Sequence, residues 1–250
     1  MFSRLFHSGR SLRVQLWLWI ALPATLALVA LSFVELYAHE RAMRQLVNER
    51  AQDRAQAIAA LLDLQIVRLQ EKLTDHVHST QHGEAAPPIA FAGGVVRFGS
   101  DGRPLDVYDA DWANEPGVLA LIERILAGQH EMVTLDREPV MLILATESHD
   151  GTVWAAGQPV DTLFQAAIGH ADHQGPPTGL ALLSGDTPIG LVGQLEDHMR
   201  GVVGVAKVAT TGWTVQAAQP WDDMFSPLLR IGGTVGAVVI IAASIAGLAA

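Results

Sequence analysis

The sequence of 250 residues contains no cysteine, only two tyrosines, and no run of lysine or arginine beyond its first 13 residues. Without cysteine, a small scaffold held by disulfides is excluded, so an exported domain must be stabilised by its hydrophobic core alone. The formal net charge is −10. An acidic chain without a basic patch is a poor partner for nucleic acid, and we predict no nucleic-acid binding.

Proline and glycine are both missing from His39 to Val77, where strong helix formers dominate. Apolar or small residues recur there at steps of three and four, which places them on one stripe of a helix. The stripe comprises Met43, Val47, Ala51, Ala55, Ile58, Leu62, Ile66, Leu69, Leu73 and Val77. We therefore expect one helix of about 55 Å. Its far half should pack on a domain, and its near half loosely or against a symmetry mate.

Charged residues are nearly absent from two long apolar stretches, at 14–37 and 231–250. Each has about 20 residues or more, enough for a helix to cross a bilayer. Basic residues beside a span stay in the cytoplasm, and Arg4, Arg10 and Arg13 precede the first stretch without any acidic residue. The pattern predicts a multi-pass plasma-membrane protein with a cytoplasmic N-terminus and residues 38–228 outside the cytoplasm.

Each stretch has an alternative interpretation. The first is longer than the apolar region of a cleaved signal peptide, and its nearest cleavage site is poor. The second would be unusually apolar for a buried helix of a soluble protein, because it holds no charge. Gly232 and Gly236 in the second stretch have the spacing that lets two membrane helices approach closely, although glycine and alanine are also simply common in such helices.

Beyond residue 88 the pattern changes to short strands separated by turn residues. Helices are expected at 115–127 and 161–168, and a loop at 78–88. We expect eight strands in four hairpins, which are VVRFG with PLDVY, VMLILATE with TVWAAG, GLALLS with PIGLVG, and GVVGVAKV with TGWTVQAA. Short loops join antiparallel neighbours. The predicted class is α+β, with two transmembrane helices that flank a long helix and antiparallel sheet modules, and not a doubly wound nucleotide-binding fold.

Three segments carry a resemblance to a known family. They are VVRFGSDGRPLDVY, GTVWAAGQPVDTLF and the closing VVGVAKVATTGWTVQAAQPWDDMF, which leads directly into the second apolar stretch. With the long helix in front, they resemble the double Cache (PAS-like) extracellular sensor domain of bacterial transmembrane receptors. Such domains occur on histidine kinases, chemoreceptors and diguanylate cyclases, but the sequence holds no kinase histidine box, nucleotide glycine motif or GGDEF-like segment.

The resemblance implies two sheet modules, of which the second is short for the family and therefore reduced. It also implies a sensor histidine kinase whose output domain would follow Ala250. The expected organisation is a cytoplasmic N-terminus at 1–13, a transmembrane helix at 14–37, a long extracytoplasmic helix and loop at 38–84, a membrane-distal module at 85–168, a membrane-proximal module at 169–228, and a second transmembrane helix at 229–250.

In this family the ligand is expected in the distal module, between its sheet and the loops after the first hairpin. The resemblance then points to six candidate residues, Tyr108, Asp109, Asp111, Trp112, Trp154 and Asp161. An aromatic wall with a carboxylate suits a small cation or an amine. The signature Tyr-x4-Arg-x-Trp-Tyr of amino-acid binders is absent. The alternatives are core packing for the two tryptophans and a helix N-cap for Asp161.

Ten histidines are present, and several lie near carboxylates, at Asp75, His76, His78, His82 and Glu84 and again at 170–173. Such groups can bind a divalent metal or respond to pH. The spacing matches no strong zinc pattern, so we expect solvent-facing loop histidines, with no metal and no cofactor. No nucleophile elbow of the type GxSxG exists, and we expect no catalytic residues in this chain.

Two hypotheses follow. The first is the ligand-sensing and membrane-spanning part of a bacterial signal-transduction receptor, with a small molecule and membrane lipid as partners and a parallel homodimer as the working unit. The second is a membrane-anchored structural or interaction protein without signalling output.

Overall fold

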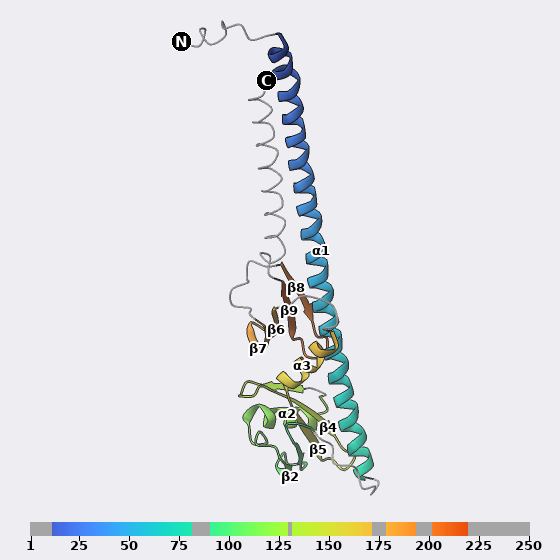
Figure 1. Cartoon of the computed structure of the whole chain (residues 1–250). Coiled ribbons are helices and arrows are strands. Elements are labelled where there is room, and N and C mark those ends of the chain that lie inside the picture. Colours follow the sequence, from blue (N-terminus) through green and yellow to red (C-terminus); the bar gives the residue numbers. More distant parts are fainter. Residues whose placement is uncertain (1–11, 82–90, 130–131, 172–178, 194–201, 220–250) are drawn as a thin grey trace. The chain divides into compact units, whose positions relative to one another are not determined.

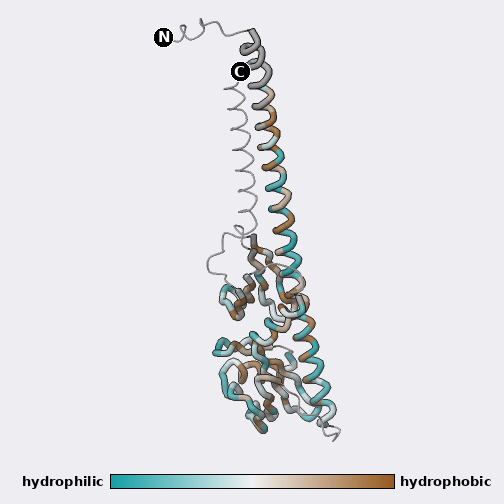
Figure 2. Tube along the Cα trace, in the orientation of Figure 1, coloured by the Kyte–Doolittle hydropathy of each residue, from teal (hydrophilic) through white to brown (hydrophobic). Residues whose placement is uncertain are grey.

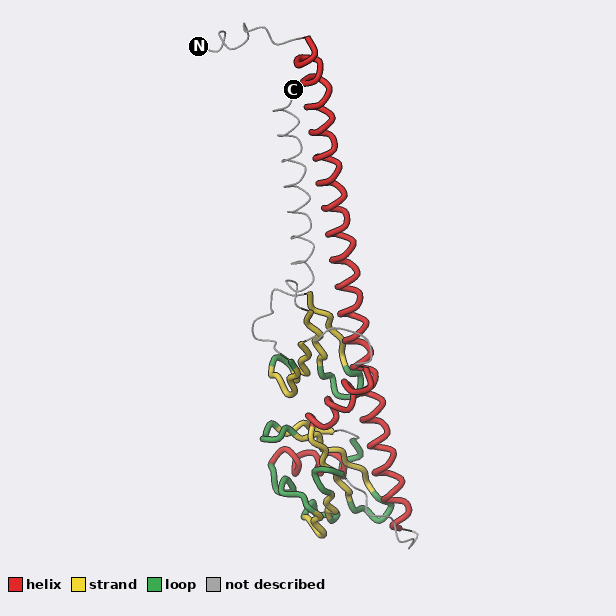
Figure 3. The backbone as a smooth tube through the Cα atoms, viewed as in Figure 1, coloured by secondary structure: helices red, strands yellow, loops and turns green. Residues whose placement is uncertain are grey.

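The computed structural model describes residues 12–81, 91–129, 132–171, 179–193 and 202–219. The chain divides into two compact units. Unit 1 comprises residues 1–48 and 221–250, and unit 2 comprises residues 49–220. Helix α1 (Leu12–Gln81) belongs to both, and it continues for 70 residues with Pro23 inside it (Figures 1 and 3). The predicted long helix is therefore present, but it reaches Gln81, so residues 78–81, which were expected in a loop, are helical.

In unit 1, α1 exposes a series of large apolar side chains. Their exposed fractions run from 43% to 82%, for Trp19, Leu26, Leu28, Leu31, Phe33, Val34, Leu36 and Tyr37. Among the described residues, no helix reaches the length and mean hydropathy required to cross a bilayer. The span predicted at 14–37 is thus not supported by the described part of α1. The span predicted at 229–250 lies outside the described residues.

Unit 2 contains a five-stranded antiparallel sheet, here called sheet A, with strand order β2-β1-β5-β4-β3. Its strands are β1 (Val95–Phe98), β2 (Pro104–Tyr108), β3 (Met132–Leu135), β4 (Met141–Glu147) and β5 (Val153–Pro159). The expected hairpins β1–β2 and β4–β5 are confirmed by their pairing. Strand β3 was not predicted. It is a half-buried edge strand of four residues, too short to show a clear alternation.

Each face of sheet A is covered by helix. Strand residues alternate between the two faces, so that Val153 and Ala155 of β5 pack with α2 (Pro116–Leu126) while Trp154 and Ala156 pack with α1 and with α3 (Val160–Ala171). Helix α2 matches the helix expected at 115–127, with Pro116 in its first turn where proline is tolerated. The face covered by α2 is called the α2 face below, and the other the α1 face.

The second sheet of unit 2, sheet B, has four antiparallel strands in the order β7-β6-β9-β8. They are β6 (Gly179–Ser184), β7 (Thr187–Val192), β8 (Val202–Lys207) and β9 (Thr214–Gln219). Both predicted hairpins are confirmed. The structure is thus α+β with antiparallel sheets and one long helix.

Helix α1 is attached to sheet B through the backbone of the edge strand β8. The side-chain amide of Gln52 donates to the Val205 carbonyl at 2.9 Å and accepts from the Val205 N–H at 3.1 Å. Gly204 lies so close to α1 that an added Cβ would overlap the backbone of Ala51. Farther along, Asp63 accepts a hydrogen bond from the Thr210 N–H at 2.9 Å.

The predicted apolar stripe of α1 is buried in unit 2, because Ala55, Ile58, Leu62 and Ile66 lie in one core with both sheets. Hydrophilic and hydrophobic residues alternate along the helix (Figure 2).

Candidate functional site

The loop from Asp109 to Glu115, between β2 and α2, carries three of the six candidate residues and follows a fourth, Tyr108. The chain leaves β2 in a tight turn. Asp109 adopts a left-handed conformation with φ of 52°, which aspartate tolerates better than most residues. Gly94 of the neighbouring segment has φ of 83°, and an added Cβ would overlap the carbonyls of Tyr108 and Asp109. This close approach fixes where the loop begins.

Trp112 anchors the loop to the α2 face and is completely buried. Its indole N–H donates to the carbonyl of Gly93. A Cβ added to Gly157 of β5 would lie 2.5 Å from the indole nitrogen, so the ring fits against bare backbone. Trp112 therefore packs in the core and offers no exposed aromatic surface in this structure. The exposed aromatic ring of the loop region belongs to Tyr108, which is 59% exposed.

Three carboxylates of the loop are exposed, those of Asp109, Asp111 and Glu115. Asp111 accepts a bond of 2.5 Å from the Arg137 guanidinium, which comes from the segment between β3 and β4. That bond is the main cause that lowers the pKa of Asp111 below its usual value, and the charge of Arg137 adds to it. Asp111 is thus ionised at neutral pH and lies at the surface, where a carboxylate with two acceptor oxygens can meet a cation besides Arg137.

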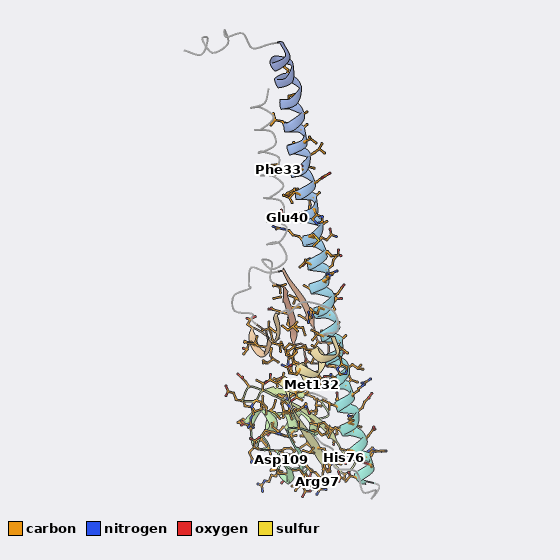
Figure 4. The ribbon with its side chains drawn as sticks, viewed as in Figure 1. Phe33, Glu40, His76, Arg97, Asp109 and Met132 are labelled. Atoms are coloured by element: carbon orange, nitrogen blue, oxygen red, sulfur yellow. The ribbon has the colours of Figure 1, made fainter. Side chains whose placement is uncertain are left out.

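Trp154 lies on the opposite face of sheet A from Trp112. It is 8% exposed and packs in the core shared with α1. The ring of His76, near the end of α1, meets it edge-on with 5.5 Å between ring centroids. The Arg97 guanidinium of β1 lies 5.8 Å from the indole centroid and pairs with Asp106 of β2 at 2.6 Å. Figure 4 labels His76, Arg97 and Asp109 at one end of unit 2.

Asp161 is exposed and sits in the first turn of α3, one residue after the helix begins at Val160. It is therefore inside the helix and not its N-cap, and a carboxylate there is favoured by the helix dipole. The structure brings together Tyr108, Asp109, Asp111 and Trp112. It places Trp154 behind the sheet and Asp161 on another helix. Ligand binding by any of the six stays a prediction.

The sequence analysis missed Arg137, Arg97 and the surroundings of His76. Arg137 pairs with Asp111, 26 residues away in sequence, and no local motif signals this. Arg97 pairs with Asp106, which lies opposite it in the β1–β2 hairpin. His78 was expected in a loop but lies on α1, because the helix continues to Gln81, and His76 was expected to face solvent but is half-buried. His82 and Glu84 lie outside the described residues. Within the described ranges, no three metal-ligating side chains gather closely enough to hold a metal ion.

Comparisons with known proteins gave likenesses to solved structures. No family model matches the chain, and no curated protein matches it. Among solved structures, the chain is similar to the Vibrio cholerae LuxQ periplasmic domain, with 12% identical residues, a TM-score of 0.39, and coverage of 76% of this chain and 95% of that domain.

Proposed function

We propose that this chain is the ligand-sensing, membrane-attached part of a bacterial signal-transduction receptor, and that its complete form is a sensor histidine kinase. The observation that supports it most is the course of α1. One uninterrupted helix carries the core residues Ile58, Leu62 and Ile66 of unit 2 and, in unit 1, a stretch of exposed apolar side chains from Trp19 to Tyr37. A large exposed apolar surface indicates a lipid or protein contact. The proposal assigns residues 14–37 and 229–250 to the membrane and 38–228 to the outside.

Cysteine labelling in intact cells tests this topology, because the chain has no cysteine of its own. Ser100→Cys, at an exposed position beside the β1–β2 turn, should react with a membrane-impermeant maleimide in intact cells. Leu36→Cys, at a position that is 43% exposed on α1, should react only after detergent is added, because lipid covers it. The topology is wrong if Ser100→Cys reacts only in lysed cells, or if Leu36→Cys reacts as readily as Ser100→Cys.

The proposal includes a parallel homodimer through α1. Away from the core, α1 exposes Ala57, Ala60, Leu64 and Val67, at steps of three and four residues. Leu64 is 45% and Val67 is 37% exposed. Apolar residues at this spacing form the contact stripe of two-stranded coiled coils. In the same labelling experiment, Ala60→Cys supports this interface if oxidation joins two chains into a dimer on a denaturing gel.

The proposed ligand is a small molecule with a positively charged amine. Asp109 and Asp111 offer carboxylates at the loop surface, and the Tyr108 ring lies beside them in sequence and is exposed. Charge-assisted hydrogen bonds to carboxylates and contact with an aromatic face are the interactions that ammonium groups favour. Arg137 is then the group with which the ligand competes for Asp111.

Asp111→Asn should weaken the binding of such an amine about tenfold or more, because a hydrogen bond to a charged group contributes about 1.5–3 kcal/mol. The measurement is titration calorimetry of the full chain in detergent with a panel of primary amines. Asp186→Asn, at an exposed turn of sheet B, is the matched control and should bind as the unchanged chain does. If no amine binds, or if both variants weaken binding equally, the ligand assignment is wrong while the topology is still judged by labelling.

A membrane-anchored interaction protein without signalling is the second candidate. The exposed apolar stretch of α1 is equally compatible with that role. A structural change of the purified chain on ligand binding is expected of the sensor and not of the interaction protein, so it distinguishes the two candidates.

A further inference from the structure

The end of α1 is held on the α1 face of sheet A by His76 as well as by apolar residues. Leu73 and Val77 are buried in the core, and His76, between them, is half-buried with its ring edge against Trp154. Burial lowers the pKa of His76 below its ordinary value. Neutral imidazole fits this place, and imidazolium does so poorly because it loses hydration there.

An arginine already lies at this contact, and two further histidines lie close to the end of α1. Arg97 lies over the same indole, that of Trp154, with its guanidinium 5.8 Å from the ring centroid. Two residues beyond His76, the ring of His78 lies 6.1 Å from the ring of His149, which belongs to the turn between β4 and β5. Three histidines and an arginine thus gather where α1 ends.

Two carboxylates of this region have partners of their own. Asp106 is paired with Arg97 at 2.6 Å. Asp150 is bound by the hydroxyl and the backbone N–H of Thr152 at 2.7 and 3.0 Å. The titratable and charged groups on α1 beside His76, and on the strands and turn of sheet A around Trp154, are Lys72, Asp75 and His78 of α1, Arg97 of β1, Asp106 of β2, Glu147 of β4, and His149 and Asp150 of the turn that follows.

We propose that His76 is a pH-sensitive latch, which holds the last turns of α1 on sheet A while neutral and releases them when it is protonated. Protonation places a second cation beside Trp154, next to Arg97, in a site that burial makes unfavourable for charge. Because the released segment binds the proton more tightly than the docked one, acid favours release. For one proton, the opening constant rises by up to tenfold per pH unit between about 6.5 and the pKa of docked His76, and then levels off.

This inference needs neither the membrane topology nor the amine ligand. Hydrogen–deuterium exchange of residues 73–81 in the full chain tests it, at pH 5.0 to 7.5 with rates corrected for intrinsic exchange. The corrected opening constant of the unchanged chain should rise at acid pH. His76→Phe keeps a ring against Trp154 without a titratable group, and its opening constant should change less than about twofold. The control His170→Gln, on the exposed side of α3, should behave as the unchanged chain.

The proposal is overturned if exchange of this segment does not depend on pH, or if His76→Phe keeps the full dependence. Should that variant fail to fold, histidine NMR of the unchanged chain decides. A midpoint for His76 below 6.5 supports the latch, and one at or above 6.5 removes its basis.

Discussion

Replacing Trp112 with alanine should lower the free energy of unfolding by about 3–5 kcal/mol. The indole is completely buried on the α2 face, and its N–H satisfies the carbonyl of Gly93. Alanine leaves a cavity lined by Met141 and the backbone of Gly157. It also leaves the Gly93 carbonyl without this hydrogen bond. The measurement is denaturant unfolding of the full chain, followed by far-ultraviolet circular dichroism so that the lost fluorophore does not bias the result.

Tyr108→Ala is the control for Trp112→Ala, because it removes an aromatic ring only four residues away that is 59% exposed. Its expected cost is below about 1 kcal/mol. A similar loss for both variants would mean that Trp112 is no more part of the core than Tyr108. It would then be available to a ligand, as the sequence alone suggested.

Replacing Gly204 with valine should cost about 3 kcal/mol or more, because the new side chain has no space on the face that meets α1. The atoms that it would meet are the backbone of Ala51 and the amide nitrogen of Gln52, and backbone inside a helix cannot move aside as a flexible side chain can. Unfolding should also expose sheet B before sheet A, which exchange of the β8 and β9 amides would detect.

Gly169→Ala provides the matched control for Gly204→Val. Gly169 lies within α3, and an added Cβ there meets no atom within 4 Å. Alanine in a helix is favoured over glycine by about 0.5–1 kcal/mol, so this variant should be stabilised. If Gly204→Val unfolds at the same denaturant concentration as the unchanged chain, α1 does not pack on β8 as described.

The helices and hairpins that depend on neighbouring residues could be predicted from sequence patterns. The stripe from Ala51 to Val77 followed from helical periodicity, and its residues are buried as expected except Leu69, which is partly buried. The hairpins followed from turn residues, including Gly102 and Gly185, whose φ angles are positive as their turns require. Helix α2 followed from an apolar stripe and a proline at its start.

Contacts between distant parts of the chain were not predictable in this way. Strand β1 pairs with β5, more than fifty residues later, and that pairing places Trp154 and Trp112 on opposite faces of sheet A. A one-residue change of register reverses which face a side chain occupies. Sequence patterns do not reveal which face of the sheet each tryptophan occupies, so both were predicted to belong to one site. The ion pair of Asp111 with Arg137 depends on the same sheet order.

The two hydrogen bonds between the Gln52 side chain and the Val205 backbone have a consequence for the handling of fragments. They occupy the outward N–H and carbonyl of the edge strand β8, where another extended chain would otherwise add itself. In a fragment that begins after residue 52, the outer edge of β8 would therefore be unpaired, with Val203 and Val205 exposed beside it. Such a fragment should aggregate. A fragment that also includes the turns of α1 up to and including Gln52 should stay in solution.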